Sequence, residues 1–404
     1  MTSARASQIQ DYRPDPGVVP EVSVVMPCLN EAETLAECIA AAKAGFASAG
    51  VEGRILIADN GSTDGSQGIA ATHGARVINV AERGYGNALR AGMAAASGKF
   101  LIMGDADLSY DFSKIAPFVE TLRSGADLVM GCRMPSGGGS IDPGAMPWKH
   151  RWLGNPLLTL IGRILFRCPS HDFHCGLRAL TKEAFHKMDL RTSGMELASE
   201  MVIKASLRGL KIEEVPITLH KDGRSRPPHL RSWRDGWRHL RFMMLFSPRW
   251  LLLYPGIAAM LLGGAFFLRL LVGPIRVGTV NFDLNSLEMA GMVFLFGYQM
   301  ILFACFARIF AYTRGFLPDN HALSRAFGFF TLEKGLVGGA AVFVAGFFVI
   351  LFALFGWAST GFGNLNPLET TRTVMAGRTL ASVGLQTILF SLIFSYLGVD
   401  DKSR

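Results

Sequence analysis

Two carboxylates, Asp105 and Asp107, follow directly on the apolar run 100–103. This short run predicts a buried strand. Side chains two residues apart on an extended chain share a face, so both carboxylates can project from one strand end. Two hard oxygen ligands on one edge suit Mg²⁺ or Mn²⁺, which complete their coordination with water and substrate phosphates. The alternative is that both aspartates are solvated turn residues.

Two further polar motifs also follow predicted strands. Residues 27–31 come after the strand 22–26, and residues 59–66 come after the strand 54–58. Helix patterns alternate with these strands, which predicts βαβ units and a mainly parallel α/β sheet. The strand ends then converge on one edge of the sheet, where open α/β folds bind their ligands.

The second part of the chain differs in composition from the first. The chain has 404 residues, 50% of them hydrophobic, and more than one domain is expected at this length. Four apolar runs are long enough to cross a membrane as helices, at 250–272, 289–312, 335–357 and 376–397. We expect a flexible arm at 1–20, a catalytic domain at 21–228, an amphipathic juxtamembrane helix at 229–248 and an all-α transmembrane domain at 249–404.

A cationic and aromatic segment stands immediately before the first apolar run. Arginines and tryptophans recur at helical spacing through 229–248, which indicates a helix in the membrane interface. A domain helix with a solvated basic face is the alternative. The connection 313–334 carries more Lys and Arg than 273–287 or 358–375, which predicts a cytoplasmic catalytic domain and two cytoplasmic termini. Residues 1–20 lack the apolar core of a signal peptide.

The formal net charge of +8 is typical of proteins that bind one of three kinds of partner: nucleic acid, a phosphorylated ligand or an anionic membrane surface. The densest cationic block lies next to the first apolar run, so we favour the membrane and expect no nucleic acid partner. The six cysteines are scattered and do not resemble a disulfide framework. One compact group could bind zinc: Cys168, His171, His174 and Cys175. Structural zinc sites usually space their ligands more recognisably, so we expect local hydrogen bonds from both histidines.

Four ordered motifs resemble one known family. They are Val-Val-Met-Pro-Cys-Leu-Asn-Glu at 24–31, Ala-Asp-Asn-Gly-Ser-Thr-Asp-Gly-Ser at 58–66, Gly-Tyr-Gly-Asn-Ala at 84–88 and Asp-Ala-Asp at 105–107. This series is similar to that of family 2 glycosyltransferases, whose fold is the GT-A type. With its short soluble domain, basic helix and few spans, the chain most resembles the polyprenyl-phosphate sugar synthases. The resemblance covers roughly residues 21–245.

The resemblance implies a nucleotide-sugar site built from these motifs. Asp105 and Asp107 would bind the Mg²⁺ or Mn²⁺ that bridges the donor diphosphate, and Asp59 would hold the edge of the base. Asp64 can instead cap the helix that follows, and residues 60–62 also form a turn. The nucleotide-sugar-binding residues that we expect are Pro27, Leu29, Asn30, Glu31, Asp59, Asn60, Ser62, Asp64, Arg83, Gly84, Asn87, Asp105, Ala106 and Asp107.

A lipid phosphate as acceptor changes what the site requires. Such a phosphate is ionised at neutral pH, so its oxygen can attack C1 of the sugar without a general base. The site then needs cations that position the phosphate. Arg133, after the strand 126–131, is the first candidate, and Arg224 and Arg226 are the second. Ordinary surface or headgroup contacts are the alternative for these arginines.

A second acidic region of the family is matched by Asp172 and Arg178, and we expect Asp172 to be catalytic. Glu196 and Glu200 share a face of the next predicted helix. Like charges on one face are unfavourable unless they are paired. Pairing with Arg178 and a catalytic role therefore both stay open for these glutamates.

The predicted reaction is the inverting transfer of a hexose from a nucleotide sugar, UDP-glucose-like or GDP-mannose, to a polyprenyl phosphate. The product would serve the assembly of a cell-envelope glycan or glycoconjugate. The sequence leaves open the sugar, the prenyl length and whether the protein forms a homo-oligomer.

Two other functions compete with this one. A processive membrane polysaccharide synthase shares the catalytic fold and typically carries Gln-x-x-Arg-Trp near the interface. Here Arg249 and Trp250 are present, but Phe246 stands in place of the Gln. A non-catalytic membrane protein that binds sugar nucleotides is the other alternative. The pair Asp105 and Asp107 argues against it, because a membrane anchor needs no metal site.

Overall fold

The chain folds as two units, Met1–Leu245 and Phe246–Arg404. The computed structural model describes residues 19–225, 232–313, 332–364 and 366–399. Of the residues predicted to act at the site, Arg226 lies outside the described residues.

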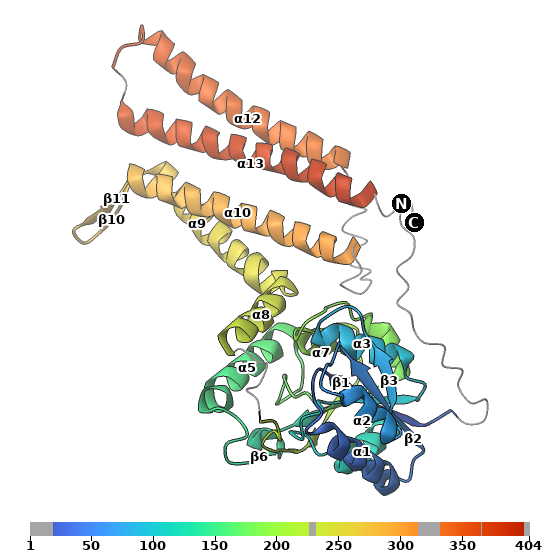
Figure 1. The fold of residues 1–404 in the computed structure, drawn as a ribbon. Helices are drawn as coiled ribbons and strands as arrows, with labels where there is room; N and C mark the ends of the chain where they lie inside the picture. The colour runs from blue at the N-terminus through green and yellow to red at the C-terminus, as the bar shows by residue number, and fades with distance from the viewer. Residues whose placement is uncertain (1–18, 226–231, 314–331, 365, 400–404) are drawn as a thin grey trace. The chain divides into compact units, whose positions relative to one another are not determined.

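A seven-stranded sheet forms the centre of the first unit (Figure 1). Its strands are β1 (Val22–Cys28), β2 (Gly53–Asp59), β3 (Arg76–Asn79), β4 (Phe100–Met103), β5 (Leu128–Cys132), β7 (Arg178–Thr181) and β8 (Ile212–Pro216). Their spatial order is β3-β2-β1-β4-β7-β5-β8. All neighbours are parallel except β7, which runs antiparallel to β4 and β5. The predicted mainly parallel sheet is confirmed, and β1, β2 and β4 are adjacent as the converging motifs require.

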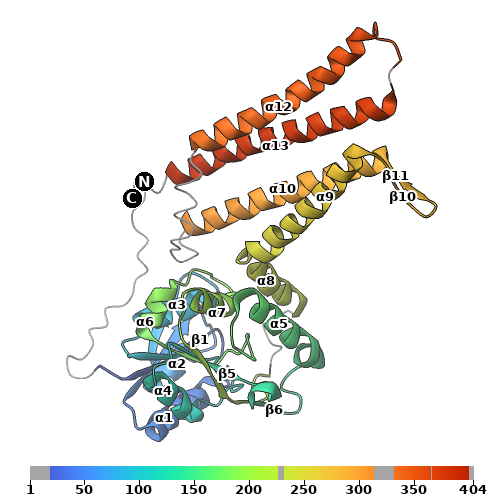
Figure 2. The same cartoon turned by 180° about the vertical axis from the view of Figure 1, so that it is seen from behind.

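Helices cover both faces of this sheet (Figure 2). On one face, α1 (Leu35–Ala49) and α4 (Ala116–Arg123) pack around the 3₁₀ turn Phe112–Lys114. On the other face, α3 (Tyr85–Ala95) packs on β1 and β2. The other helices of this unit are α2 (Ser66–Thr72), α5 (Asn155–Phe166), α6 (Lys182–Met188), α7 (Leu197–Leu207) and α8 (Ser232–Leu245).

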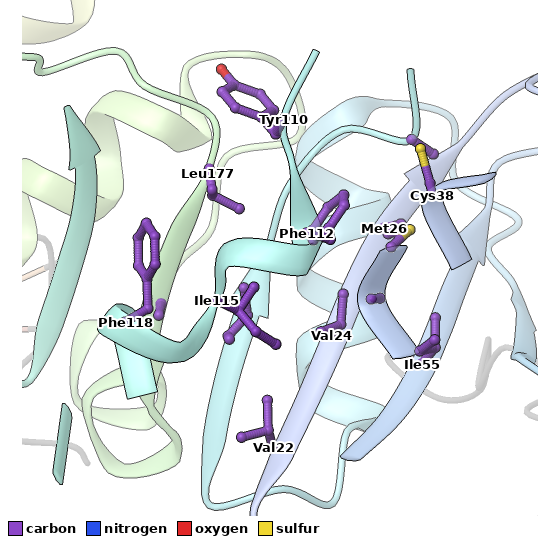
Figure 3. Close-up of a cluster of buried hydrophobic side chains, with 14 of the residues drawn as sticks. Val22, Val24, Met26, Cys38, Ile55, Tyr110, Phe112, Ile115, Phe118 and Leu177 are labelled. Atoms are coloured by element: carbon purple, nitrogen blue, oxygen red, sulfur yellow. The ribbon is translucent and has the colours of Figure 1, made fainter. Parts of the chain in front are cut away.

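The strand β1 is buried on both faces. Val22, Val24 and Met26 are each 0% exposed and pack with side chains of α1 and the 3₁₀ turn (Figure 3). Val25 points the opposite way, towards Gly92 of α3, where a Cβ at position 92 would lie only 2.4 Å from Val25 Cγ1. This double burial explains why the strand is mostly apolar on both faces, without the alternation of a half-exposed strand.

The stretch between β5 and α5 contains short regular elements. A short strand β6 (Ser140–Ile141) pairs in parallel with β9 (Thr218–Leu219). A π-helical segment, His150–Gly154, leads into α5. The partner of β6 comes from a distant segment, so the local sequence does not reveal this pairing.

Four long apolar helices form the second unit. They are α9 (Tyr254–Val272), α10 (Leu284–Thr313), α12 (Leu332–Ser359) and α13 (Pro367–Val399). A π-helical segment, Arg249–Leu253, precedes α9, and the hairpin of β10 (Ile275–Val277) and β11 (Val280–Phe282) connects α9 to α10. The helices contain four candidate membrane spans, Arg249–Val272, Leu284–Tyr312, Leu332–Ser359 and Leu368–Tyr396. The last begins before the predicted residue 376.

Glycines allow the membrane helices to pack in pairs at backbone distance. Gly346 of α12 faces α13 so closely that a Cβ there would lie 2.3 Å from the amide nitrogen of Ala381. A Cβ at Gly384 of α13 would likewise lie 2.3 Å from the amide nitrogen of Phe343 on α12. The pair α9 and α10 shows the same close approach, at Gly256, Gly263 and Gly297. Small residues matter here because burial against another helix instead of lipid gives little hydrophobic gain, so close packing must hold the pairs.

Candidate active site

Asp105 lies just beyond the end of β4 in a half-buried position. Tyr85, at the start of α3, lies close enough to its carboxylate to favour the ionised form and lower the pKa of Asp105. Gly176 lies against it, where a Cβ would stand 3.2 Å from Asp105 Oδ2. Burial, and then the negative charge of Asp107, raise the pKa of Asp105 to about 7. A partly buried carboxylate destabilised by a second carboxylate is a site at which a bound cation would be favourable.

Asp107 is the second carboxylate of the pair and is held from two sides. Its Oδ1 accepts hydrogen bonds from the backbone N–H and hydroxyl of Ser109. Its Oδ2 lies 3.0 Å from Nη2 of Arg224. Within the described ranges, no group of three His, Cys, Asp or Glu side chains could hold a metal ion. The pair fits a Mg²⁺ or Mn²⁺ ion that takes its other ligands from diphosphate and water, since such ions bind few carboxylates.

The ends of β1 and β2 are joined by hydrogen bonds from the predicted nucleotide motifs. The backbone N–H of Asn30 donates to Ser62 Oγ at 2.9 Å, and Asn30 Oδ1 accepts from the N–H of Thr63 at 2.8 Å. Asn30 has a φ of +60°, a conformation that asparagine tolerates better than most residues. Asp64 accepts from the N–H of Ala32 and from the N–H and hydroxyl of Ser66. Asp64 therefore connects the two loops and also bonds the first residue of α2.

Asp59 closes the turn that follows β2. Its carboxylate accepts from the N–H groups of Gly61 and Ser62, and from Gln67 Nε2 at 2.7 Å. The side chain is 2% exposed. These bonds occupy much of the carboxylate in this structure, so the residue predicted to contact the base also shapes its own loop.

Asn60 organises the loop after β3. Its amide nitrogen donates to the carbonyl oxygens of Val80 and Glu82, and its Oδ1 accepts from the N–H of Gly84 at 2.6 Å. Gly84 is confined further, because a Cβ there would lie 2.3 Å from the carbonyl oxygen of Ser193. Bonds from the side chain of Asn60 to these backbone groups thus bring the predicted residues of the second and third motifs together.

The loop containing Ser193 is held in turn by a buried glutamate. Glu200 on α7 accepts hydrogen bonds from the backbone N–H groups of Arg191 and Thr192 and forms an ion pair of 2.7 Å with Lys204. The carbonyl of Ser193 then accepts from the N–H of Gly86 at 2.9 Å. Glu200 is therefore paired with Lys204, and it holds the loop 191–193 that bonds Gly86. The pairing of Glu200 with Arg178 that the sequence suggested is wrong.

Arg178 instead bonds backbone carbonyls. Its guanidinium donates to the carbonyl oxygens of Cys175, Phe173 and Ala198, and the residue is fully buried at the start of β7. Burial lowers the pKa of Arg178. This arginine fixes the turn after Asp172.

Arg133 and Asp172 form a buried, bidentate ion pair. Arg133 Nε and Nη2 lie 2.7 and 2.8 Å from the two carboxylate oxygens of Asp172, and the backbone N–H of Arg133 adds a third bond of 3.0 Å. Although burial opposes ionisation, the charge and hydrogen bonds of Arg133 hold the pKa of Asp172 below its usual value. The pair leaves Nη1 of Arg133 unused by Asp172, so this edge of the guanidinium is the part that could meet a phosphate.

Tyr110 and Asp105 both border Gly176, and Tyr110 was missed in the sequence. The Tyr110 hydroxyl accepts a hydrogen bond from the N–H of Gly176 at 2.9 Å, and a Cβ at Gly176 would lie 2.9 Å from this hydroxyl and 3.2 Å from Asp105 Oδ2. The available signal was an aromatic residue a few positions after the carboxylates, which alone is uninformative.

Arg224 lies at the carboxylates of the donor motifs. Its Nε is 2.9 Å from Glu31 Oε2, and its Nη2 contacts Asp107. The structure therefore brings Arg224 to the predicted metal site. Its sequence-based assignment to the acceptor phosphate stays a prediction.

The remaining predicted residues line the same strand ends. Thr34 Oγ1 donates to the carbonyl oxygen of Ala106 at 2.6 Å, which ties the loop after β1 to the metal motif. Asn87 Nδ2 donates to the carbonyl of Arg83 at 3.3 Å. Leu29 and Arg83 are exposed, whereas Pro27 is half-buried.

Two histidines anchor α8 to the rest of the first unit. His239 Nδ1 lies 2.8 Å from Ser199 Oγ on α7, and the rings of His174 and His239 meet edge to face at 4.7 Å. His171 Nδ1 is 2.8 Å from Glu214 Oε2. His171 thus pairs with a glutamate from a distant segment and His174 packs against α8.

An exposed apolar surface runs along α5 and the turn before it. Trp148 and Trp152 are 70% and 64% exposed, and the same surface includes Leu157, Leu160 and Ile164. Helix α5 contacts α8, whose Trp237 is 58% exposed (Figures 1 and 2). The tryptophans were not recognised in the sequence, although two Trp beside Lys149 and Arg151 were the signal.

The fold and the site together define a GT-A type catalytic domain followed by a membrane domain. Residues 23–189 match the family described as glycosyl transferase family 2, and residues 305–398 match the glycosyltransferase family 2 C-terminal transmembrane region. The chain is 35% identical over 389 residues to the low-salt glycan biosynthesis hexosyltransferase Agl6 of Haloferax volcanii, covering 95% of this chain and 91% of that protein. The chain therefore belongs to glycosyltransferase family 2 and is an integral membrane glycosyltransferase.

Two more similarities concern the catalytic domain. The dolichyl-phosphate hexose transferase of Haloferax volcanii is 29% identical over 198 residues, covering 49% of this chain and 82% of that protein. Glucosyl-3-phosphoglycerate synthase of Mycobacterium tuberculosis, solved with Mn²⁺, UDP and glucosyl-3-phosphoglycerate, is 21% identical with a TM-score of 0.43, covering 56% of this chain and 80% of that one.

Proposed function

We propose that this glycosyltransferase transfers a hexose, with inversion, from a nucleotide sugar to a polyprenyl phosphate. The observation that carries the proposal is the arrangement of opposite charges at strand ends on one edge of the sheet. Asp105 and Asp107 follow β4 and Arg133 follows β5, and only β7 lies between these two strands, which run in the same direction. A relative named dolichyl-phosphate hexose transferase supports a lipid-phosphate acceptor.

On the donor side, Asp105 and Asp107 would hold Mg²⁺ or Mn²⁺. When bound, such an ion neutralises charge on the diphosphate leaving group. The residues of the chain supply the frame: Asn60 fixes the loop that carries Arg83, and Asn30 and Ser62 connect the ends of β1 and β2. This frame presents exposed Leu29 and Arg83 to the nucleotide and its phosphates.

On the acceptor side, Arg133 would position the lipid phosphate. A phosphate oxygen forms the new bond to C1 while the bond from C1 to the nucleotide diphosphate breaks, and that electron pair leaves with the diphosphate. No proton is transferred, so no general base is required. Asp172 then serves as a positioning residue, because its two oxygens hold Nε and Nη2 of Arg133.

The product's anomeric configuration tests the proposal. Purified protein would be incubated with a panel of α-linked UDP- and GDP-sugars, polyprenyl phosphate and Mg²⁺ or Mn²⁺, and the organic-extractable lipid analysed by mass spectrometry and NMR. We expect one β-linked polyprenyl-phosphate hexose, because displacement from the back of C1 inverts it. An α-linked product would contradict direct displacement. A polymeric product would indicate the processive synthase instead.

The catalytic domain would meet its lipid substrate at the cytoplasmic membrane surface. The exposed tryptophans before α5 and on α8, together with exposed Arg234, Arg238 and Arg241, have the composition of an interfacial surface. The bias of Lys and Arg towards the connection 313–334 supports a cytoplasmic orientation of this domain and of both termini.

Replacing Trp148 and Trp152 by Ser should raise the KM for the lipid acceptor several-fold. The reason is that these indoles would hold the acceptor side of the domain at the headgroup level. The KM for the nucleotide sugar should stay unchanged, because neither tryptophan lies in the donor motifs. Steady-state kinetics in lipid nanodiscs measure both constants. An unchanged acceptor KM would show that α5 does not contact the membrane.

A further inference from the structure

Residues 223–225, which we call the strap, lie across the carboxylates of the donor site. The backbone N–H of Gly223 donates to the carbonyl oxygen of Asp107 at 2.9 Å. The approach is close, because a Cβ at Gly223 would lie 2.8 Å from Leu108 Cδ1 and 3.1 Å from Thr34 Cγ2. The strap is thus fitted to the loop that carries the metal motif.

Arg224 is the centre of the strap and bridges two carboxylates. Its Nε lies 2.9 Å from Glu31 Oε2, and its Nη2 lies 3.0 Å from Asp107 Oδ2. The side chains of Arg224, Glu31 and Asp107 are only 11%, 5% and 12% exposed, so these ion pairs are weakly screened by solvent. Although burial opposes it, the charges of Asp107, Glu31 and Asp105 raise the pKa of Arg224.

A second anchor holds the end of the strap. The backbone N–H of Ser225 donates to Glu33 Oε2 at 2.8 Å, and its hydroxyl donates to Glu33 Oε1. Glu33 is outside the predicted nucleotide-binding set. It offers a way to loosen the strap without altering Arg224 or the carboxylates of the site.

We propose that Arg224 is an internal counter-cation that competes with the divalent metal ion for Asp107. The inference rests on the metal site of the proposed function. A metal ion that takes Asp107 Oδ2 must displace Nη2 of Arg224, and two cations against one carboxylate oxygen would repel each other. The strap therefore closes the metal site in the absence of donor and lowers the affinity for metal alone.

The affinity for Mn²⁺ alone tests this competition. The full-length protein in nanodiscs would be titrated with Mn²⁺ without nucleotide, and free Mn²⁺ measured by electron paramagnetic resonance. Arg224→Met removes the charge and keeps much of the side-chain length. We expect it to bind Mn²⁺ about tenfold more tightly than the wild type, because no arginine then occupies the carboxylate of Asp107. Arg224→Lys, which retains a cation, should stay near the wild-type value.

Two further variants control the experiment. Arg123→Met removes an arginine that pairs with Glu21 on the surface, so it should leave the Mn²⁺ affinity unchanged. Glu33→Gln weakens the anchor of Ser225, so it should tighten Mn²⁺ binding by a smaller factor. If Arg224→Met fails to fold, as a thermal unfolding scan would show, Glu33→Gln still decides the question, because Mn²⁺ binding no tighter than in the wild type would contradict the competition.

The outcomes separate this inference from the proposed function. Equal Mn²⁺ affinities of wild type, Arg224→Met and Glu33→Gln would overturn the competition and leave the metal site intact. Binding of Mn²⁺ by none of the variants would overturn both. Tighter binding by Arg224→Met that is abolished when Asp107→Asn is added would support both.

Discussion

Changing Asp105 and Asp107 together to Asn should reduce hexose transfer by about 10³-fold or more, since loss of a catalytic metal removes several kcal/mol of charge stabilisation and each 1.36 kcal/mol is tenfold. Asn keeps the shape of Asp, so the effect isolates the charge that a metal ion needs. The rate of sugar transfer to the lipid fraction, measured over a range of Mg²⁺ concentrations, provides the readout. Activity that survives the double change would remove the pair from the catalytic machinery.

The unfolding temperature distinguishes this loss of activity from a loss of the fold. Burial and the neighbouring charge raise the pKa of Asp105 to about 7. A carboxyl group with a raised pKa stabilises the fold when protonated, and that contribution is lost as the pH rises through the folded-state pKa. Asp105→Asn alone should therefore unfold at the same or a higher temperature than the wild type at pH 8. The exposed Glu120→Gln is the matched control, for which neither activity nor stability should change.

The second large effect is expected at Arg133. Arg133→Ala leaves Asp172 as a buried charge without its partner, which should cost about 3–5 kcal/mol of unfolding free energy. Transfer should fall by about 10²-fold even well below the unfolding temperature, the size of misplacing a reacting group by about 1 Å. The KM for the lipid phosphate should rise while the KM for the nucleotide sugar stays constant. Chemical denaturation and two-substrate kinetics measure the two effects.

A charge-neutral pair separates the structural from the functional role of Arg133. The double variant Arg133→Met with Asp172→Leu removes both buried charges, and such replacements are often neutral for stability. It should therefore unfold near the wild-type midpoint and still fail to use the acceptor. Normal transfer by this double variant would contradict the assignment of Arg133. Rescue of transfer by Arg133→Lys would indicate that a single charge, without the bidentate geometry, is sufficient.

The sequence alone predicted the features that depend on the pattern of residues within short segments. Apolar runs followed by polar motifs predicted β1, β2 and β4 and the convergence of their ends, because parallel strands present their carboxyl ends at one edge. Four apolar runs predicted four membrane helices, because the length of a span is set by the thickness of the bilayer. Both features depend on local patterns that can be recognised without knowing how the chain packs.

The sequence was weaker where short segments depend on distant partners. The strand β7 has four residues, Arg178–Thr181, and is held by pairing on both sides with β4 and β5. The last membrane helix extends back past Arg372, which the sequence read as part of a connection. In the structure Arg372 forms an ion pair with Asp283, and pairing reduces the cost of a charge near a span.

The carboxylates Asp105 and Asp107 and the family of the chain were thus determined by the sequence alone, because the spacing of a motif places its side chains on one face. Only the tertiary structure decided which positively charged side chain lies against these carboxylates. Arg224 reaches Asp107 from a segment more than a hundred residues further along the chain, and Arg133 is held by Asp172 in the same way. Such pairings form only when the sheet brings distant loops together, so the local sequence around each of these arginines does not reveal its partner.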